Sequence, residues 1–278
     1  GCKNMNIWQA FIGVIATALT TFANLIGGVG IPYSWGFAII LFTLVIKLIT
    51  MPLTLQQLRA SRAMQELQPE IEKLKKKYGK DREKISQAQM ELYKEAGVNP
   101  LGGCLPMLVQ LPIWFALYRA LFQLAGEGVL DEGFFWVPSL AGPVNQYPGL
   151  SWLWPMPPVV GWTVAIAFLI LPILTVVTQI IVQKMTTPTN PDPQQASMNQ
   201  MMLLMPFMFG FFALQVPQGL VLYWVTSNIF SLIQQYFITG WGSLKPAPTA
   251  AEASATPVSE TRPDAKRTRK DGKRKRKR

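Results

Sequence analysis

The sequence predicts an all-α polytopic membrane protein: five transmembrane helices, an N-terminal interfacial helix and a cytoplasmic helical hairpin. Half of the 278 residues are hydrophobic and only 15% are charged. The apolar residues gather in runs that approach the ~20 residues that a hydrocarbon core of ~30 Å requires. Lys and Arg exceed Asp and Glu by 26 to 15. This combination indicates apolar spans with basic segments outside the bilayer.

The composition gives enzymatic chemistry little support, so we do not expect an enzyme. The chain has no His and only two Cys, Cys2 and Cys104. These cannot build a disulfide framework or a Cys/His zinc site. The sequence also lacks a GxxxxGK[ST] phosphate-binding loop and a G-x-S-x-G nucleophile elbow. We therefore expect neither a cofactor nor a bound metal.

The N-terminal segment, residues 1–33, contains one uncharged helix. Residues 6–28 either span the bilayer or lie in its interface as an amphipathic helix. The chain begins with Gly1 and Cys2, and a Gly-Cys junction resembles the end of a bacterial lipoprotein signal. Cys2 is therefore a lipidation candidate, with a cloning scar as the alternative.

The first predicted span, residues 34–55, contains one cation, Lys47. An ionisable group at the bilayer centre costs at least ~2.5 kcal/mol, so it usually faces a polar cavity or a partner. The alternative is snorkelling, because Lys47 lies about two turns from the inner boundary expected near Pro52. Lys47 is the first candidate site residue.

Residues 56–98 predict a helical hairpin in water. Apolar side chains recur at three- and four-residue steps on either side of a turn at residues 79–81. Residues 57–96 hold 10 Lys/Arg and 7 Asp/Glu. Because basic residues close to a span are retained on the cytoplasmic side, the hairpin is expected in the cytoplasm.

The second predicted span, residues 100–124, departs from a uniform lipid-facing helix. Pro106 and Pro112 free backbone carbonyls that need a neighbour or water. Gln110 lies between them, and this helix is expected to line a polar feature. An ordinary interhelical hydrogen bond is the alternative role for Gln110.

Three further spans are predicted over residues 159–183, 199–215 and 219–240. Residues 125–158 contain no Lys or Arg and many Trp, Pro and Gly, which predicts an outside loop with aromatic anchors. The fourth span is rich in Met, which suits an adaptable surface, although gap filling is the commoner role. Only a short turn separates the last two spans, so we expect them to form a tight hairpin.

Residues 241–278 predict a disordered cytoplasmic tail, with 12 Lys/Arg against 4 Asp/Glu and nothing able to form a core. A polybasic tail binds RNA phosphate or anionic lipid through counterion release. A simple topology signal is the alternative. The candidates for contact with a ribosome or acidic lipid are Lys266, Arg267, Arg269, Lys270, Lys273, Arg274, Lys275, Arg276, Lys277 and Arg278.

Two long blocks carry a resemblance to a known family. They read NPLGGCLPMLVQLPIWFALYRAL over residues 99–121 and MMLLMPFMFGFFALQVPQGLVLYWVTSNIFSLIQQY over residues 201–236. With the order of spans and hairpin, residues 34–240 closely resemble the YidC/Oxa/Alb family of membrane protein insertases, in particular its Gram-positive-like bacterial members. The resemblance implies a five-helix core around a hydrophilic groove that is open to cytoplasm and lipid and closed to the outside. It also favours the interfacial placement of residues 6–28.

The resemblance also implies which residues face the groove. Lys47 falls in IKLITMPL, where bacterial members usually have an arginine, so it would supply the positive charge without the planar five-donor fork. Tyr223 and Trp224 match an LYW motif, with packing as the alternative role. Polarity alone suggests three weaker candidates. The full set is Lys47, Gln110, Tyr223, Trp224, Thr43, Asn228 and Gln234.

The implied function is insertion of nascent hydrophobic segments into the bilayer, with or without a Sec translocon. The expected partners are nascent membrane proteins, the ribosome and membrane lipids, and the protein is expected to act as a monomer in the bacterial plasma membrane. Its N-terminus is expected outside. A small-solute transporter or channel using the same cavity is the alternative, although we find no convincing internal repeat. A passive assembly scaffold, which would tolerate loss of Lys47, is a third.

Overall fold

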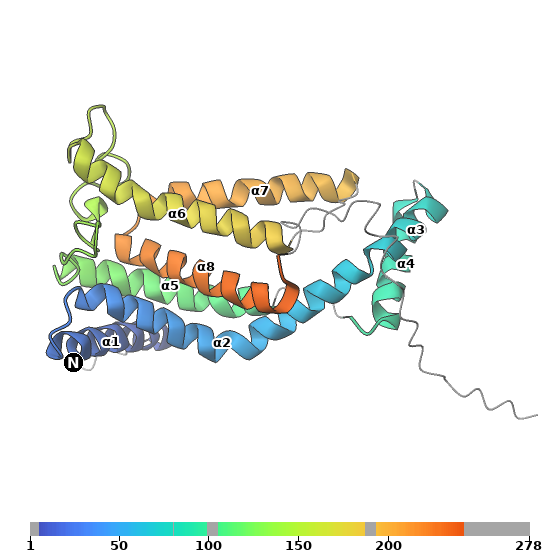
Figure 1. The fold of residues 1–278 in the computed structure, drawn as a ribbon, viewed down its shortest axis with the longest axis horizontal. Coiled ribbons are helices and arrows are strands. Elements are labelled where there is room, and N and C mark those ends of the chain that lie inside the picture. The colour runs from blue at the N-terminus through green and yellow to red at the C-terminus, as the bar shows by residue number, and fades with distance from the viewer. Residues whose placement is uncertain (1–5, 80, 99–104, 187–192, 242–278) are drawn as a thin grey trace, which may run out of the picture. The chain divides into compact units, whose positions relative to one another are not determined.

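The computed structural model describes residues 6–79, 81–98, 105–186 and 193–241, and these ranges are helical apart from short connections and one long loop. The only β pairing among them is an isolated bridge between Phe134 and Val137. The predicted all-α class is therefore confirmed. The helices are α1 (Ile7–Gly28), α2 (Ser34–Glu66), α3 (Gln68–Tyr78), α4 (Arg82–Glu95), α5 (Leu105–Gly126), the 3₁₀ turn η2 (Pro143–Asn145), α6 (Trp162–Thr186), α7 (Pro193–Ala213) and α8 (Gln218–Thr239) (Figure 1).

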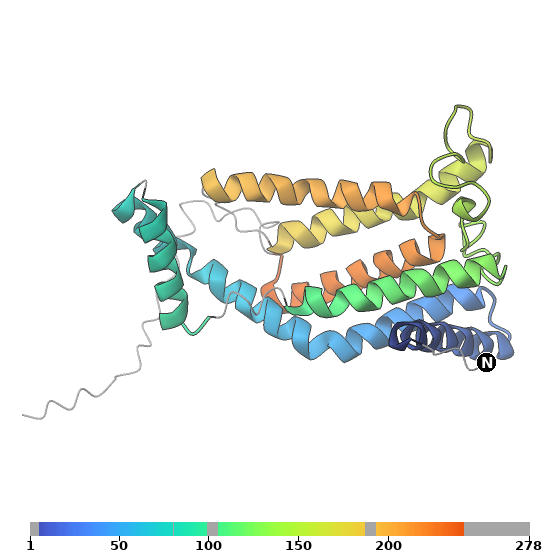
Figure 2. The ribbon, with the colours of Figure 1, turned by 180° about the vertical axis from the view of Figure 1, so that it is seen from behind.

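Helix α8 lies inside the bundle, between α6 on one side and α2 and α5 on the other (Figures 1 and 2). Helix α7 packs mainly on α6, and α1 packs on α2 and α5. Although the loop between α7 and α8 is short, α8 contacts α6 and α2 far more than it contacts α7. The last two helices are thus consecutive in the sequence, but each packs mainly on other helices and not on its neighbour in the chain.

A glycine allows the close approach of α7 to α6. A Cβ atom at Gly210 would lie 2.3 Å from Cγ2 of Val176, so only a residue without a side chain fits there. On the opposite side of the bundle, α1 buries Ile15, Leu19 and Ala23. These contacts place α7 and α1 at the periphery.

Among the described residues, four helical segments are long and apolar enough to cross a membrane: α1, α2, residues 108–126 of α5, and α6. Helix α7 adds a shorter apolar segment, Leu203–Ala213. The polytopic membrane class is therefore confirmed, while the number of spans stays a prediction. Because α1 meets the length requirement, its placement at the interface also stays a prediction.

Helix α2 continues without a break through Pro52 to Glu66, well beyond the inner boundary expected near Pro52. Proline within a helix removes one backbone hydrogen bond, and the 33 residues remain one helix despite this loss. Helices α3 and α4 then form the hairpin, which turns at Gly79 with φ +60°. The side chain of Asp81 caps α4 by accepting a 3.2 Å hydrogen bond from the backbone N–H of Lys84.

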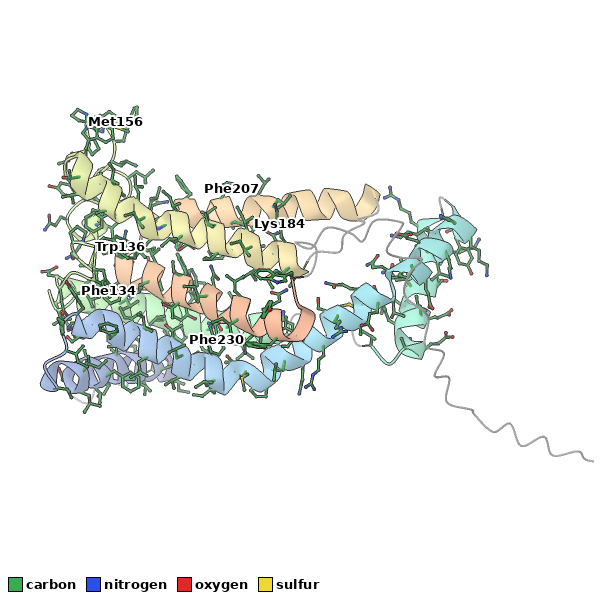
Figure 3. The ribbon with its side chains drawn as sticks, viewed as in Figure 1. Phe134, Trp136, Met156, Lys184, Phe207 and Phe230 are labelled. Carbon is green, nitrogen blue, oxygen red and sulfur yellow. The ribbon has the colours of Figure 1, made fainter. Side chains whose placement is uncertain are left out.

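Hydrogen bonds at several points fasten the loop over residues 127–161 to the bundle. Glu132 accepts hydrogen bonds from the backbone N–H groups of Ser34 and Trp35, at 3.0 and 3.3 Å, at the start of α2. The fully buried Trp152 donates from Nε1 to the carbonyl oxygen of Leu214 at 3.2 Å. In Figure 3 the loop residues Phe134, Trp136 and Met156 lie at one end of the bundle, and Lys184 of α6 lies toward the other.

Candidate functional site

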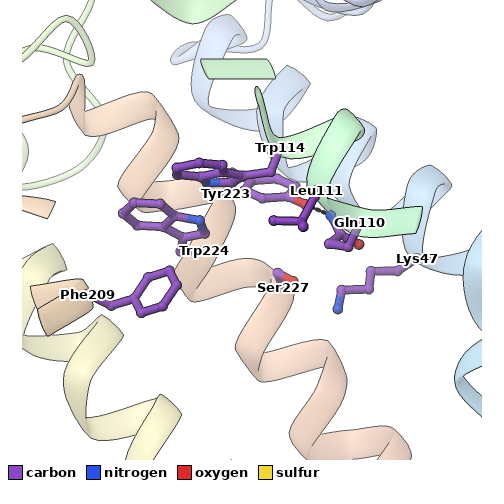
Figure 4. A pocket seen from close by; sticks show the side chains of 8 residues that line it. All are labelled: Lys47, Gln110, Leu111, Trp114, Phe209, Tyr223, Trp224 and Ser227. Carbon is purple, nitrogen blue, oxygen red and sulfur yellow. Dashed lines mark hydrogen bonds between the residues drawn. The ribbon is translucent and has the colours of Figure 1, made fainter. Parts of the chain in front are cut away.

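A pocket of about 270 Å³ lies between α2, α5, α7 and α8 (Figure 4). An ammonium, an amide and hydroxyls face it together with aromatic rings. The lining residues are Lys47, Gln110, Leu111, Trp114, Phe209, Tyr223, Trp224 and Ser227.

Lys47 brings a positive charge to the pocket from α2. Its Nζ atom donates a 3.0 Å hydrogen bond to Oγ of Ser231 on α8, and that hydroxyl donates to the carbonyl oxygen of Ser227 at 2.9 Å. No carboxylate pairs with Lys47 in the part of the chain that the structure describes. Because an ammonium has three N–H donors, it can still bind an anion that enters the pocket.

Gln110 and Tyr223 join α5 to α8 across the pocket. Nε2 of Gln110 donates a 2.6 Å hydrogen bond to the hydroxyl oxygen of Tyr223, drawn as the dashed line in Figure 4. The Tyr223 hydroxyl keeps its own hydrogen as a donor. This pair therefore adds neutral polar groups beside the Lys47 charge.

Aromatic rings form the other wall of the pocket. Trp114 stacks on Trp224 with ring centroids 6.0 Å apart and an interplanar angle of 17°. Phe209 meets the same Trp224 ring edge-on, at 5.7 Å and 81°. In Figure 4 these rings lie away from the Lys47 ammonium. The pocket is thus amphipathic, with a cationic, polar end and an apolar aromatic end.

The structure brings four of the seven sequence-predicted groove residues together: Lys47, Gln110, Tyr223 and Trp224 all line this pocket. Their role in binding a client stays a prediction. The three weaker candidates do not line it.

The three weaker candidates lie in helix contacts. Thr43 is fully buried, and its hydroxyl donates to the carbonyl oxygen of Ile39 at 2.6 Å within α2. Asn228 donates from Nδ2 to Oγ1 of Thr178 at 3.1 Å, which joins α8 to α6. Gln234 is buried, and its amide atoms have no partner among the described residues.

Other predictions fall outside the described residues. These are the lipidation candidate Cys2 and the tail residues Lys266, Arg267, Arg269, Lys270, Lys273, Arg274, Lys275, Arg276, Lys277 and Arg278. Within the described ranges, no group of three or more His, Cys, Asp or Glu side chains is placed to hold a metal ion.

Sequence reasoning missed several residues of the pocket. Trp114 follows Gln110 by four positions and Ser227 follows Tyr223 by four, so helical periodicity would have placed each on the face of a residue already chosen. Ser231 continues the α8 face one turn further. Phe209 carries no such signal, because α7 reaches the pocket only through tertiary packing.

The fold and the pocket define a class of protein: a polytopic α-helical membrane protein with a lysine in a pocket between its helices, where no carboxylate of the described residues pairs with it. Residues 27–244 match the family model described as 60Kd inner membrane protein, and the chain belongs to this family. It is the YidC/Oxa/Alb family that the sequence motifs indicated, so that prediction is confirmed.

Relatives come from chloroplasts and from bacteria. ALBINO3-like protein 1, chloroplastic, of Arabidopsis thaliana is 44% identical over 249 residues, which cover 86% of this chain and 48% of the relative. Membrane protein insertase YidC of Ectopseudomonas mendocina is 41% identical over 210 residues, covering 76% and 32%. The chain therefore spans about half the length, or less, of these curated relatives.

A solved structure also resembles the fold. The crystal structure of an active YidC insertase with its first transmembrane domain resolved superposes with a TM-score of 0.57 and 30% sequence identity. The match covers 81% of this chain and 46% of that one.

Proposed function

We propose that this protein is a membrane protein insertase that receives nascent hydrophobic segments in the pocket between α2, α5, α7 and α8 and releases them into the bilayer. The observation that carries the proposal is that Lys47, which has no carboxylate partner in the described part of the chain, lies in one pocket with an aromatic wall. Relatives bearing the name of membrane protein insertase, at 41% identity, support it.

In the proposed mechanism, the polar flank of a client enters the pocket first. The Lys47 ammonium attracts acidic residues of this flank, and water in the pocket shortens the stretch of hydrocarbon that the flank must cross. The apolar part of the client packs against the aromatic wall and then moves into lipid. Burying ~20 apolar residues in the bilayer supplies the free energy, so neither a nucleotide nor a covalent step is needed.

The proposal places the protein in the bacterial plasma membrane with the α3–α4 hairpin and the basic tail in the cytoplasm and the N-terminus outside. There the tail would hold a translating ribosome nearby through RNA phosphate or would bind anionic lipid. The protein acts as a monomer, alone or beside a Sec translocon. Removal of residues 262–278 is then expected to weaken ribosome binding in a salt-dependent way, measured by co-sedimentation.

The test is insertion of a single-span client with an acidic outgoing tail into proteoliposomes that contain this protein alone. Lys47→Ala and Lys47→Glu are expected to lower the insertion rate about tenfold or more, whereas Lys47→Arg retains it. Lys94→Ala, which removes a cation of α4 far from the pocket in sequence, serves as the matched control.

Two outcomes would contradict the proposal. Full activity in all three Lys47 variants would show that insertion does not need the charge. That result would favour the snorkelling role for Lys47 and a passive scaffold for the protein. Wild-type vesicles that insert no client but conduct a small solute in a Lys47-dependent manner would favour the transporter or channel.

A further inference from the structure

A second cation lies on an outer face of one of the bundle helices, and it does not line the pocket. Arg119 is exposed on α5 and has no carboxylate partner in the described part of the chain. Gly126, the last residue of α5, lies seven positions after Arg119, which places Arg119 ~10 Å from that end of the helix at 1.5 Å per residue. An ionisable side chain at such depth is unfavourable in lipid alone and marks a functional position by default.

Arg119 belongs to an exposed face of α5 that begins at the pocket. Apart from Val109, the exposed residues of this helix recur at three- and four-residue steps, so they share one face. Leu111 lines the pocket and is also 39% exposed, and Phe115 is 49% exposed. The face is formed by Leu108, Leu111, Pro112, Phe115, Arg119 and Gln123.

The same face therefore joins the pocket, with Lys47, to Arg119. From Leu111 to Arg119 the helix rises ~12 Å. Phe115 occupies the interval, and the face between Leu111 and Arg119 is apolar. A segment lying along α5 would meet a positive charge at the pocket, an apolar stretch, and a second positive charge nearer the Gly126 end.

We infer that Arg119 binds the acidic residues of a client's outgoing flank after they leave Lys47, and thereby favours clients with acidic flanks. This inference rests on the proposed function and extends it to a second residue. An acidic side chain that leaves the pocket crosses ~12 Å of apolar surface. A second cation at the end of that interval stabilises the charge before it reaches water at the far side.

The occupant we favour is a client carboxylate, because the face that carries Arg119 meets the pocket at Leu111 and neither Lys47 nor Arg119 has a carboxylate partner in the described part of the chain. An anionic lipid headgroup carries the same charge, and the experiment separates the two. Proteoliposomes are made with zwitterionic lipid alone or with added anionic lipid. Two single-span clients are compared, one with two Asp in the outgoing flank and one with two Asn at the same positions.

In zwitterionic vesicles, Arg119→Gln is expected to slow insertion of the Asp client about tenfold and to leave the Asn client within about twofold of wild type. Arg119→Lys, which keeps the charge, is expected to retain most of the rate. Unchanged thermal unfolding in detergent serves as the control for folding.

Three results would overturn the inference. Equal slowing of both clients indicates a structural role, an effect confined to anionic vesicles indicates a lipid site, and no effect shows that Arg119 is not used. In each of these cases wild-type insertion leaves the proposed function standing. If wild-type protein inserts neither client, the proposed function fails first and this inference fails with it.

Discussion

The ammonium of Lys47 donates a 3.0 Å hydrogen bond to Oγ of Ser231, across the contact between α2 and α8. Because the Ser231 hydroxyl already donates to the carbonyl oxygen of Ser227, it acts only as an acceptor toward Lys47. A side chain at position 231 is therefore within direct reach of the charge that we propose to receive clients.

Replacing Ser231 by aspartate is expected to block insertion of acidic clients while leaving Lys47 in place. A carboxylate at this position pairs with the ammonium and competes with the client for it. We expect Ser231→Asp to approach the Lys47→Ala defect, about tenfold, in the proteoliposome assay.

The matched control is Ser231→Asn, which has nearly the same size as the aspartate but no charge. It should keep at least half of the wild-type rate. If both variants lowered the insertion rate equally, the cause would be a steric effect at α8 and not the added charge.

The hydrogen bond between Gln110 and Tyr223 is expected to contribute modestly to stability. Interhelical hydrogen bonds in membrane proteins average ~0.6 kcal/mol, and the pocket is large enough for water to replace the lost partner. Tyr223→Phe should lower the free energy of unfolding in detergent by about this amount. Tyr236→Phe, at a residue of α8 that is 47% exposed, should cause no change. If Tyr223→Phe lowered the free energy of unfolding several times more than this, water would not be replacing the Tyr223 hydroxyl as a partner of Gln110.

Gly36 is required by the contact between α2 and the loop over residues 127–161. A Cβ atom at this position would lie 1.9 Å from Cδ2 of Phe134, so an added methyl group overpacks the contact. Gly36→Ala is expected to cost ~1–3 kcal/mol in unfolding experiments. Gly13→Ala is the control, because no atom lies within 4 Å of the position that its added methyl group would occupy.

A second substitution tests the cause of this effect. Phe134→Ala should destabilise the wild-type protein. It should destabilise the Gly36→Ala variant less, because truncation of Phe134 also removes the clash between its ring and the added methyl group. Strict additivity of the two changes would mean that Gly36 and Phe134 are not coupled.

The start of α4 is expected to lose protection in acid. The pKa of Asp81 lies below its ordinary value because its carboxylate accepts hydrogen bonds from the Lys84 side chain and backbone. Since the folded pKa is depressed, the stabilisation is present above the unfolded pKa of about 3.9 and is lost as the pH falls through the folded value.

Hydrogen exchange of the Lys84 amide, corrected for the intrinsic rate, measures this effect. Its protection should fall below about pH 4 in wild type. It should stay level in Asp81→Asn, which keeps a capping side chain that does not titrate. A parallel fall in the Asn variant would assign the acid sensitivity to other groups.

Part of the site could be predicted from sequence because some signals are local. A lysine within an apolar run and a glutamine between two prolines are unusual wherever the helices lie, and both Lys47 and Gln110 line the pocket. Polarity alone predicted the pocket lining less well. The Thr43 hydroxyl donates a hydrogen bond within its own helix, and the Asn228 amide donates one to Thr178 of α6. A polar residue in a span has several ways to find a partner, and its type does not say which one it uses.

The sequence by itself determined the helical membrane class, because partition into lipid depends on the length and composition of each segment and on the location of its charges. It also determined the family, through the two long motif blocks. Only the tertiary structure decided how each helix is rotated and which side chains share a pocket. Phe209 reaches Trp224 because α7 packs closely on α6 at Gly210, a contact between residues far apart in the chain. Such contacts depend on the fit of two surfaces, which no single segment encodes.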